Sequence, residues 1–197
     1  MATMTQSNPK RLEVILQHLK ELENKEGKVG WFPSSVYEDG KPVAQIAVVQ
    51  EYGATIHHPG GTPYKITPEG AVFVKKSDGA GLPVTKPHTI VIPARPFMRP
   101  TVDREKNNWM NFFGQGIKKI LEGKTTAINV LDILVQRARG DVQKTISQVT
   151  TPPLKPGTIR ARLRKRSNKN LVGDLHKPLI DTALMFNSVE GKVENTK

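Results

Sequence analysis

A proline-rich stretch near the middle of the chain constrains the fold more than any other part of the sequence. Residues 88–92 are mostly β-branched, which favours a strand. Pro93, Pro96 and Pro100 follow, around Arg95. Each proline fixes its own φ and pushes the preceding residue toward an extended conformation, so the strand must end here. A proline in the first turn of a helix loses no hydrogen bond. The stretch therefore predicts a rigid corner between a strand and a helix.

Apolar residues recur at helical spacing in three parts of the chain. The first is residues 9–26. The second follows the proline corner and ends at Gly123, and the third begins near Thr125 or Thr126 and ends before Pro152. Each part has an apolar stripe on one face, which is typical of a helix that covers a core or contacts another subunit.

The run from Val43 to Tyr52 is compatible with two structures. Its β-branched side chains favour a strand. Pro42 before it, two alanines within it and Gly53 after it favour a short helix with a glycine C-cap. We interpret the run as a helix.

Residues 54–90 form an insertion that predicts a protruding β-hairpin. Two short apolar runs, 64–67 and 72–76, flank the turn Pro68-Glu69-Gly70, and a glycine- and proline-rich loop follows. A hairpin of this size is not stable alone, so we expect it to rest on a neighbouring subunit. Shorter strands are expected at 29–33 and at 189–193, the latter added to the main sheet.

Positive charge is concentrated late in the chain. The net charge is +12, which calls for a polyanion or an acidic protein as a partner. No acidic residue interrupts the basic block Lys155, Arg160, Arg162, Arg164, Lys165, Arg166 and Lys169. We expect 153–177 to be a solvated loop or arm, or to contact an acidic neighbour or DNA. No aromatic residue lies within the block, so contact with DNA would be to phosphate and would carry no sequence information.

Several functional classes lack support in the sequence. There is no cysteine, which excludes disulfides and thiolate catalysis. The motifs of serine hydrolases, phosphate-binding loops and zinc proteases are absent. His57 and His58 are adjacent and therefore point away from each other. We predict no catalytic residue, no cofactor and no metal, hence no enzyme. No apolar run approaches the roughly 20 residues that cross a bilayer, so no membrane partner is expected.

Three short signatures occur in order within residues 43–193. They are Gln50-Glu51-Tyr52-Gly53, Ile92-Pro93-Ala94-Arg95-Pro96-Phe97, and Pro178-Leu179-Ile180-Asp181-Thr182 followed by Leu184 and Ser188. Together they resemble the tail-completion or neck proteins of tailed double-stranded DNA bacteriophages, which include minor tail proteins of the virion morphogenesis type. One departure is Ala183, because that family usually has glycine there. We expect the turn at Ala183 to be helical from its start.

The resemblance implies an α+β fold, in which a small, mostly antiparallel sheet packs against long helices in a single domain over 1–197. It further implies a homo-oligomeric ring, expected to be a hexamer, at the head-proximal end of the tail. The neighbours would be tail-terminator and head-closure or connector proteins, and DNA would pass through the ring. The protein would be assembled in the cytoplasm of the host bacterium and would reside in the virion.

The resemblance also suggests a structural role for the corner. We hypothesise that Arg95 pairs with Glu51 and thereby ties the corner to the helix that ends at Tyr52. In the alternative, Arg95 is exposed and packs only its aliphatic stem. Two other functions stay open: a basic DNA-binding protein, although no helix-turn-helix is recognisable, and an assembly chaperone that is absent from the finished particle.

Overall fold

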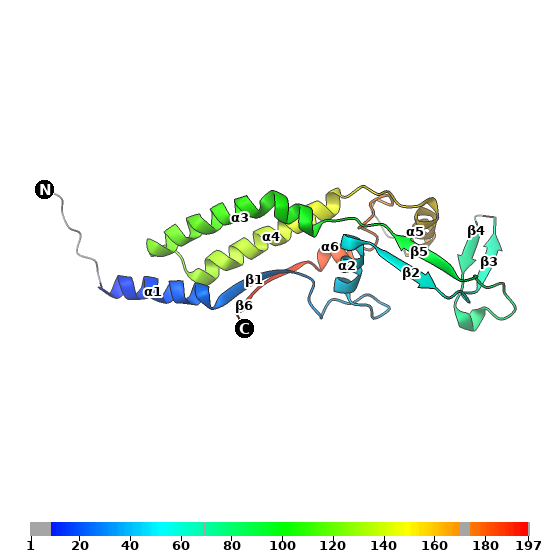
Figure 1. The fold of residues 1–197 in the computed structure, drawn as a ribbon, viewed down its shortest axis with the longest axis horizontal. Helices are drawn as coiled ribbons and strands as arrows, with labels where there is room; N and C mark the ends of the chain where they lie inside the picture. The colour runs from blue at the N-terminus through cyan, green and yellow to red at the C-terminus, as the bar shows by residue number, and fades with distance from the viewer. Residues whose placement is uncertain (1–8, 69, 170–173, 197) are drawn as a thin grey trace.

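The computed structural model describes residues 9–68, 70–169 and 174–196, without the side chains of residues 11 and 165–169. The molecule is elongated, with long helices toward one end and a narrow β-arm at the other (Figure 1). The fold is α+β, as predicted. In place of one small sheet it contains three separate two-stranded antiparallel sheets in the described residues.

Two long helices form the body. Helix α3 (Met98–Leu121) begins at the proline corner, and α4 (Ala127–Gln148) runs back along it. The side chain of Thr126 caps α4 by accepting a hydrogen bond from the N–H of Asn129 at 3.3 Å. Gly123, with φ of 72°, lies in the turn between the helices. Both helices therefore match the predicted periodicity.

A two-stranded ribbon packs against α4. Strand β1 (Lys25–Gly30) pairs with β6 (Glu190–Asn195), so the C-terminal residues add a strand as predicted. The ribbon approaches α4 closely because it carries glycine opposite Val135. A Cβ at Gly27 or at Gly191 would lie 2.5 or 2.3 Å from the methyl groups of Val135. Helix α1 (Pro9–Glu23) ends earlier than predicted, because strand β1 already begins at Lys25.

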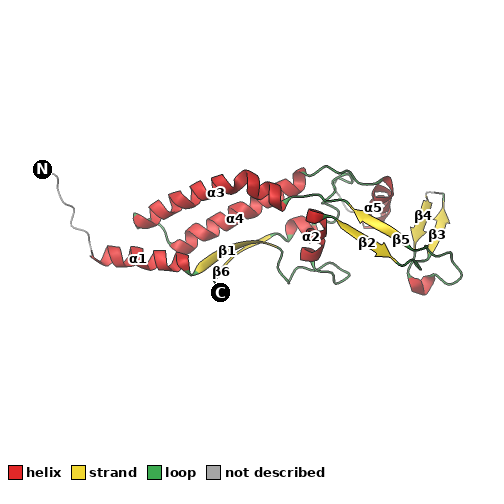
Figure 2. Cartoon of the chain, in the orientation of Figure 1, coloured by secondary structure: helices red, strands yellow, loops and turns green. Residues whose placement is uncertain are grey.

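Shorter helices lie between the body and the arm (Figure 2). Helix α2 (Val43–Tyr52) confirms the helical interpretation of that run, and the N–H of Gly53 closes it on the carbonyl of Val49 at 2.9 Å. Helix α6 (Leu184–Asn187) precedes β6. All of the basic block except Lys155 lies in helix α5 (Pro156–Lys169). Residues 153–177 were predicted to be a loop or arm, and the prediction of a loop is wrong for 156–169, which are helical.

The arm consists of two successive β-ribbons. Next to the body, β2 (Ala54–His58) pairs with β5 (His88–Ile92). At the tip, β3 (Tyr64–Thr67) pairs with β4 (Gly70–Phe73), followed by a 3₁₀ turn over Lys76–Asp78. The predicted hairpin is thus confirmed, with a second strand that begins and ends earlier, whereas β2 was not predicted.

The main core lies where the body meets the arm. Its fully or nearly fully buried apolar residues come from α2, the corner, α4 and the C-terminal segment: Val43, Ala47, Phe97, Val142, Ile146, Leu179, Met185 and Val189. Trp31 closes this core, with its ring edge against Phe97 and its indole N–H donating to the carbonyl of Met185 at 2.8 Å. A smaller cluster of Ile120, Ala127 and Val130 joins α3 to α4 at their far ends, with Leu22 of α1 packed against it.

Candidate functional site: the corner joint and the basic helix

The first two signatures meet at the buried carboxylate of Glu51. This side chain accepts hydrogen bonds from the backbone N–H groups of Phe97, Met98 and Arg99, at 2.6, 2.9 and 3.2 Å. Because those groups open α3, Glu51 serves as an N-cap supplied by another helix. Burial alone would raise the pKa of Glu51, but the three backbone donors and the Arg99 side chain together outweigh it and lower the pKa.

The ion-pair partner of Glu51 is Arg99, and the predicted pair with Arg95 is wrong. Arg99 Nε lies 2.9 Å from the Glu51 carboxylate, and its NH2 group donates to the Glu51 carbonyl at 3.0 Å. The guanidinium also lies 4.7 Å from the centre of the exposed Tyr52 ring. Arg99 reaches Glu51 because it lies in the first turn of α3, beside the N–H groups that the carboxylate already binds.

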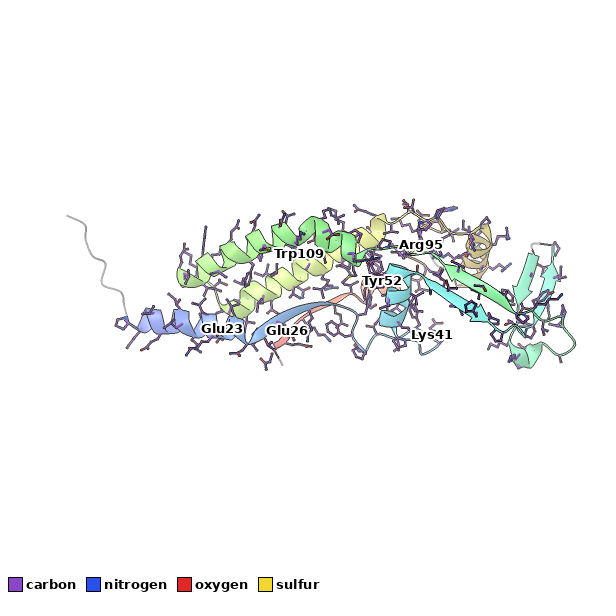
Figure 3. All side chains as sticks on the ribbon, viewed as in Figure 1. Glu23, Glu26, Lys41, Tyr52, Arg95 and Trp109 are labelled. Carbon is purple, nitrogen blue, oxygen red and sulfur yellow. The ribbon has the colours of Figure 1, made fainter. Side chains whose placement is uncertain are left out.

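Arg95 is buried and is bound to a different segment (Figure 3). Its Nε and NH2 groups donate to the carbonyls of Pro152 and Pro153, at 2.8 and 3.2 Å. Its backbone N–H donates to the carbonyl of Gln50 at 2.7 Å. Burial lowers the pKa of Arg95, because removal from water disfavours the charged guanidinium. Arg95 therefore fastens the corner to the chain that leaves α4, and the alternative of an exposed side chain is also wrong.

The third signature is bound by Arg162 of helix α5. The sequence analysis predicted that Arg162 contacts DNA or an acidic partner. Arg162 is buried, and its guanidinium donates to the carbonyls of Lys177, Pro178 and Ile180 at 2.7, 3.0 and 3.2 Å. Its Nε lies 3.5 Å from the carboxylate of Asp181. Arg162 is thus a structural residue and is not accessible to DNA.

The turn after Asp181 differs from its prediction. Ala183 adopts the left-handed conformation, with φ of 58°, and α6 begins only at Leu184. Glycine takes this conformation without strain, whereas a Cβ costs about 1–2 kcal/mol. Thr182 contributes to the turn, because its hydroxyl accepts a hydrogen bond from the N–H of Leu184 at 3.4 Å.

We call residues 50–53, 92–99 and 178–182 together the joint. Phe97 and Leu179, from the second and third signatures, share the main core with α2, which carries the first. The close approach of the first two signatures requires glycine at position 53. A Cβ there would lie 2.8 Å from the carbonyl oxygen of Ile92 and 2.9 Å from the nitrogen of Ala94, and its φ is 75°. Among these residues Pro93 is half-buried and Pro96 is exposed, and both border the buried Arg95.

The cations of the basic block differ in their exposure. Lys155, just before α5, and Arg160 are exposed, and Arg164 is half-buried. The side chains of Lys165, Arg166 and Lys169 lie outside the described residues. The backbone of α5 is nevertheless helical through Lys169, so its cations are distributed around a helix rather than along a loop.

A groove of about 800 Å³ adjoins the joint. Val36, Ile46 and Leu184 are among its apolar lining residues, and Tyr37 and Asp181 are among its polar ones. The pKa of Tyr37 is raised by burial and by the nearby negative charge of Asp181 and Asp39. Asp181 is paired with Arg162, which leaves the groove without an arrangement of nucleophile and base.

Other candidate sites yield no arrangement for chemistry in the described residues. His58 stacks on His88 across the β2–β5 ribbon, with ring centres 5.0 Å apart, while His57 lies 3.3 Å from the hydroxyl of Thr89. Within the described ranges, no group of three or more His, Cys, Asp or Glu residues could hold a metal ion. None of the described helices combines the length and apolar character that a membrane span requires.

Comparison with known proteins adds no relative. No protein-family model, no curated protein and no solved structure matches the chain.

Proposed function

We propose that this protein is a structural component of a tailed phage, which forms a ring at the neck, completes the head-proximal end of the tail and joins it to the head while DNA passes. The observation that carries the proposal is the joint. Three segments that are distant in the sequence meet there, and they are the three that resemble the neck family. The charged groups that hold these segments are used internally: Glu51 binds the start of α3, Arg95 binds the segment after α4, and Arg162 of α5 binds residues 177–181.

Such an arrangement suits a rigid scaffold better than a reactive site. An active site keeps a nucleophile, base or metal ligand available to a substrate. At and beside the joint, each buried ionic group instead binds backbone atoms of another segment, which ties α2 to α3, the corner to the segment after α4, and α5 to the C-terminal segment. Fixed geometry is what a subunit needs if repeated contacts are to close into a ring.

Exposed apolar side chains give a second line of support. They occur on most of the helices and along the arm, and include Leu12, Leu16, Met110, Ile66 and Phe73. Large exposed apolar surfaces are typical of proteins that contact other proteins. An assembly subunit therefore explains this distribution better than a protein that acts alone.

Quantitative mass spectrometry of purified phage particles, with heads and tails analysed separately, tests the proposal. We expect the chain to be present at the copy number of one ring and to travel with tails or with the head–tail junction. Absence from intact particles would reject a structural role and favour an assembly chaperone.

A basic DNA-binding protein is the second candidate, because α5 carries cations and no acidic residue. Titration of duplex DNA of several sequences at increasing salt distinguishes the two. Non-specific binding that weakens steeply with salt is compatible with a DNA conduit, whereas sequence-specific affinity at physiological salt would favour the second candidate.

A further inference from the structure

The two ribbons of the arm meet at a junction that lacks the hydrogen bonds of a continuous ladder. The β3–β4 tip is turned relative to the β2–β5 ribbon (Figure 1). Strand pairing ends with His58 opposite His88, and one step further along the same register Pro59 faces Pro87. Proline has no N–H to donate, and no backbone hydrogen bond crosses between these described segments at this step. Other contacts must therefore hold the tip to the rest of the arm.

Two histidine side chains supply these contacts. The Nδ1 atom of His58 accepts a hydrogen bond from the backbone N–H of Gly60 at 3.0 Å. The Nδ1 atom of His88 lies 2.8 Å from the carbonyl oxygen of Lys86, so this nitrogen carries a proton and donates. The two rings stack on each other, with centres 5.0 Å apart and an angle of 26° between their planes. Each histidine thus binds the junction segment of its own strand, and the stack connects the two strands.

The backbone around Gly60 is tightly packed. Its φ is 85°, and a Cβ there would lie 2.5 Å from the carbonyl oxygen of Thr85 and 2.8 Å from the nitrogen of Pro87. Cross-strand bonding resumes directly beyond it, because the N–H of Gly61 donates to the carbonyl of Thr85 at 2.8 Å. The bond from Gly60 to His58 is therefore made where the two segments approach each other most closely.

The two histidines respond differently to a second proton. A neutral imidazole has one N–H and one free nitrogen, and in His58 the free nitrogen is Nδ1, because it accepts from Gly60. A second proton on His58 must go to Nδ1, where it replaces the hydrogen bond by two opposed donors. In His88 the second proton goes to Nε2 and leaves the bond to Lys86 intact. Histidine changes its charge between about pH 5 and 8, so the bond of His58 is the acid-sensitive one.

The titratable groups near His58 provide no counter-ion for a charged ring. His88 lies against it, and Lys86 and Tyr64 line a hollow at the tip together with His88. His57 precedes it on β2 and points to the opposite face of the ribbon. Within the described residues, no carboxylate is hydrogen-bonded or ion-paired to either stacked ring. Protonation therefore removes a hydrogen bond and adds no attraction in exchange.

We propose that the two histidines form an acid-sensitive hinge in the arm. When His58 gains its second proton, the bond to Gly60 breaks, the stack with His88 weakens, and the β3–β4 tip is released to move relative to the β2–β5 ribbon. At neutral pH the hinge holds the tip in one direction. The inference concerns the arm alone and does not depend on the proposed function.

Hydrogen exchange of the purified full-length protein, read by mass spectrometry at about pH 7.5 and about pH 5.5, tests the hinge. Rates are corrected for the pH dependence of unprotected amides. We expect the protection of residues 60–64 and 84–88 to fall at least about fivefold at the lower pH, the effect of one lost hydrogen bond. Protection in α4 should stay unchanged.

Three variants identify the group that responds. His58→Asn keeps an acceptor near the position of Nδ1 but gains no proton, so the junction should stay protected at both pH values. His58→Lys is charged and has no acceptor, so protection should already be low at the higher pH. The matched control is His57→Asn, on the opposite face of the same strand, which should respond as the wild type does. Circular dichroism checks that each variant is folded.

Four results would overturn the proposal. The first is a wild-type junction whose protection does not change with pH, and the second is a loss of protection that extends through α4, which indicates general acid unfolding. The third is a His58→Asn protein that still loses protection in acid or is unprotected at both pH values, because Nδ1 would then not be the group that acts. The fourth is a His58→Lys protein that stays protected.

Discussion

Replacing Glu51 by alanine should lower the free energy of unfolding by about 3–5 kcal/mol, the range for removing one partner of a buried ionic contact. Three backbone N–H groups at the start of α3 would lose their acceptor. Loss of an N-cap costs about 0.5–2 kcal/mol, and each buried donor left unpaired adds about 1–3 kcal/mol when water cannot replace the acceptor. Arg99 contributes little of the total, because its side chain is 55% exposed and such pairs are worth about 0–1 kcal/mol.

The comparison of three variants in urea denaturation separates the cap from the ion pair. Glu51→Gln keeps an oxygen that can accept from the backbone, so we expect it to cost about half as much as Glu51→Ala. Arg99→Ala should cost no more than about 1 kcal/mol. The reasoning would be refuted if Arg99→Ala destabilised the protein as much as Glu51→Ala, because the ion pair would then dominate the cap.

The same carboxylate should make stability depend on pH in the acid range. The pKa of Glu51 is lower in the folded protein than its ordinary value of 4.5. Its contribution is therefore fully present above pH 4.5, and it is lost as the pH falls through the lower, folded-state pKa. The free energy of unfolding of wild type should decline below pH 4.5 more steeply than that of Glu51→Gln. Parallel declines would show that other carboxylates account for the acid sensitivity.

Three further substitutions test other parts of the structure by the same denaturation assay. Arg162→Met should lower the free energy of unfolding by about 3–5 kcal/mol, because it removes the guanidinium that binds several backbone carbonyls and the carboxylate of Asp181. Replacement of a surface cation would have almost no effect on stability. Ala183→Gly should stabilise by about 0.5–1 kcal/mol, because it relieves a left-handed alanine at some cost in unfolded-chain entropy; a loss of stability would contradict that conformation. Gly191→Ala should destabilise by at least about 1 kcal/mol through collision with Val135, and a neutral result would mean that the ribbon can move away from α4.

The long helices could be predicted from sequence because their apolar residues repeat over many turns. In α4 the same face carries Val135, Val142 and Ile146, and all three are buried. Helix α2 was predictable for a different reason, since Pro42 and Gly53 mark its ends in spite of β-branched residues between them. Boundary residues thus decided the structure where side-chain preferences were ambiguous.

The missed features depend on contacts that no local pattern encodes. Strand β2 contains two histidines and precedes a proline and two glycines, so only its pairing with β5 makes it a strand. Helix α5 is highly polar, and its buried cation Arg162 is bound by a loop that comes later in the chain. Arg95 and Arg99 are both arginines and lie four residues apart. Which of them meets Glu51 depends on the path of the corner in space.

Gly53 has a further consequence for the shape of any assembly. Both strands of the arm leave the body at this point, β2 directly after Gly53 and β5 directly before Pro93, and the two segments touch. The two strands are therefore held close together where the arm begins, and the joint sets the direction of the arm. If successive copies of a ring contact one another through the arm, that direction sets the angle between them, and the angle decides between a closed ring and an open filament. The number of subunits per turn would then depend on a glycine at the base of the arm.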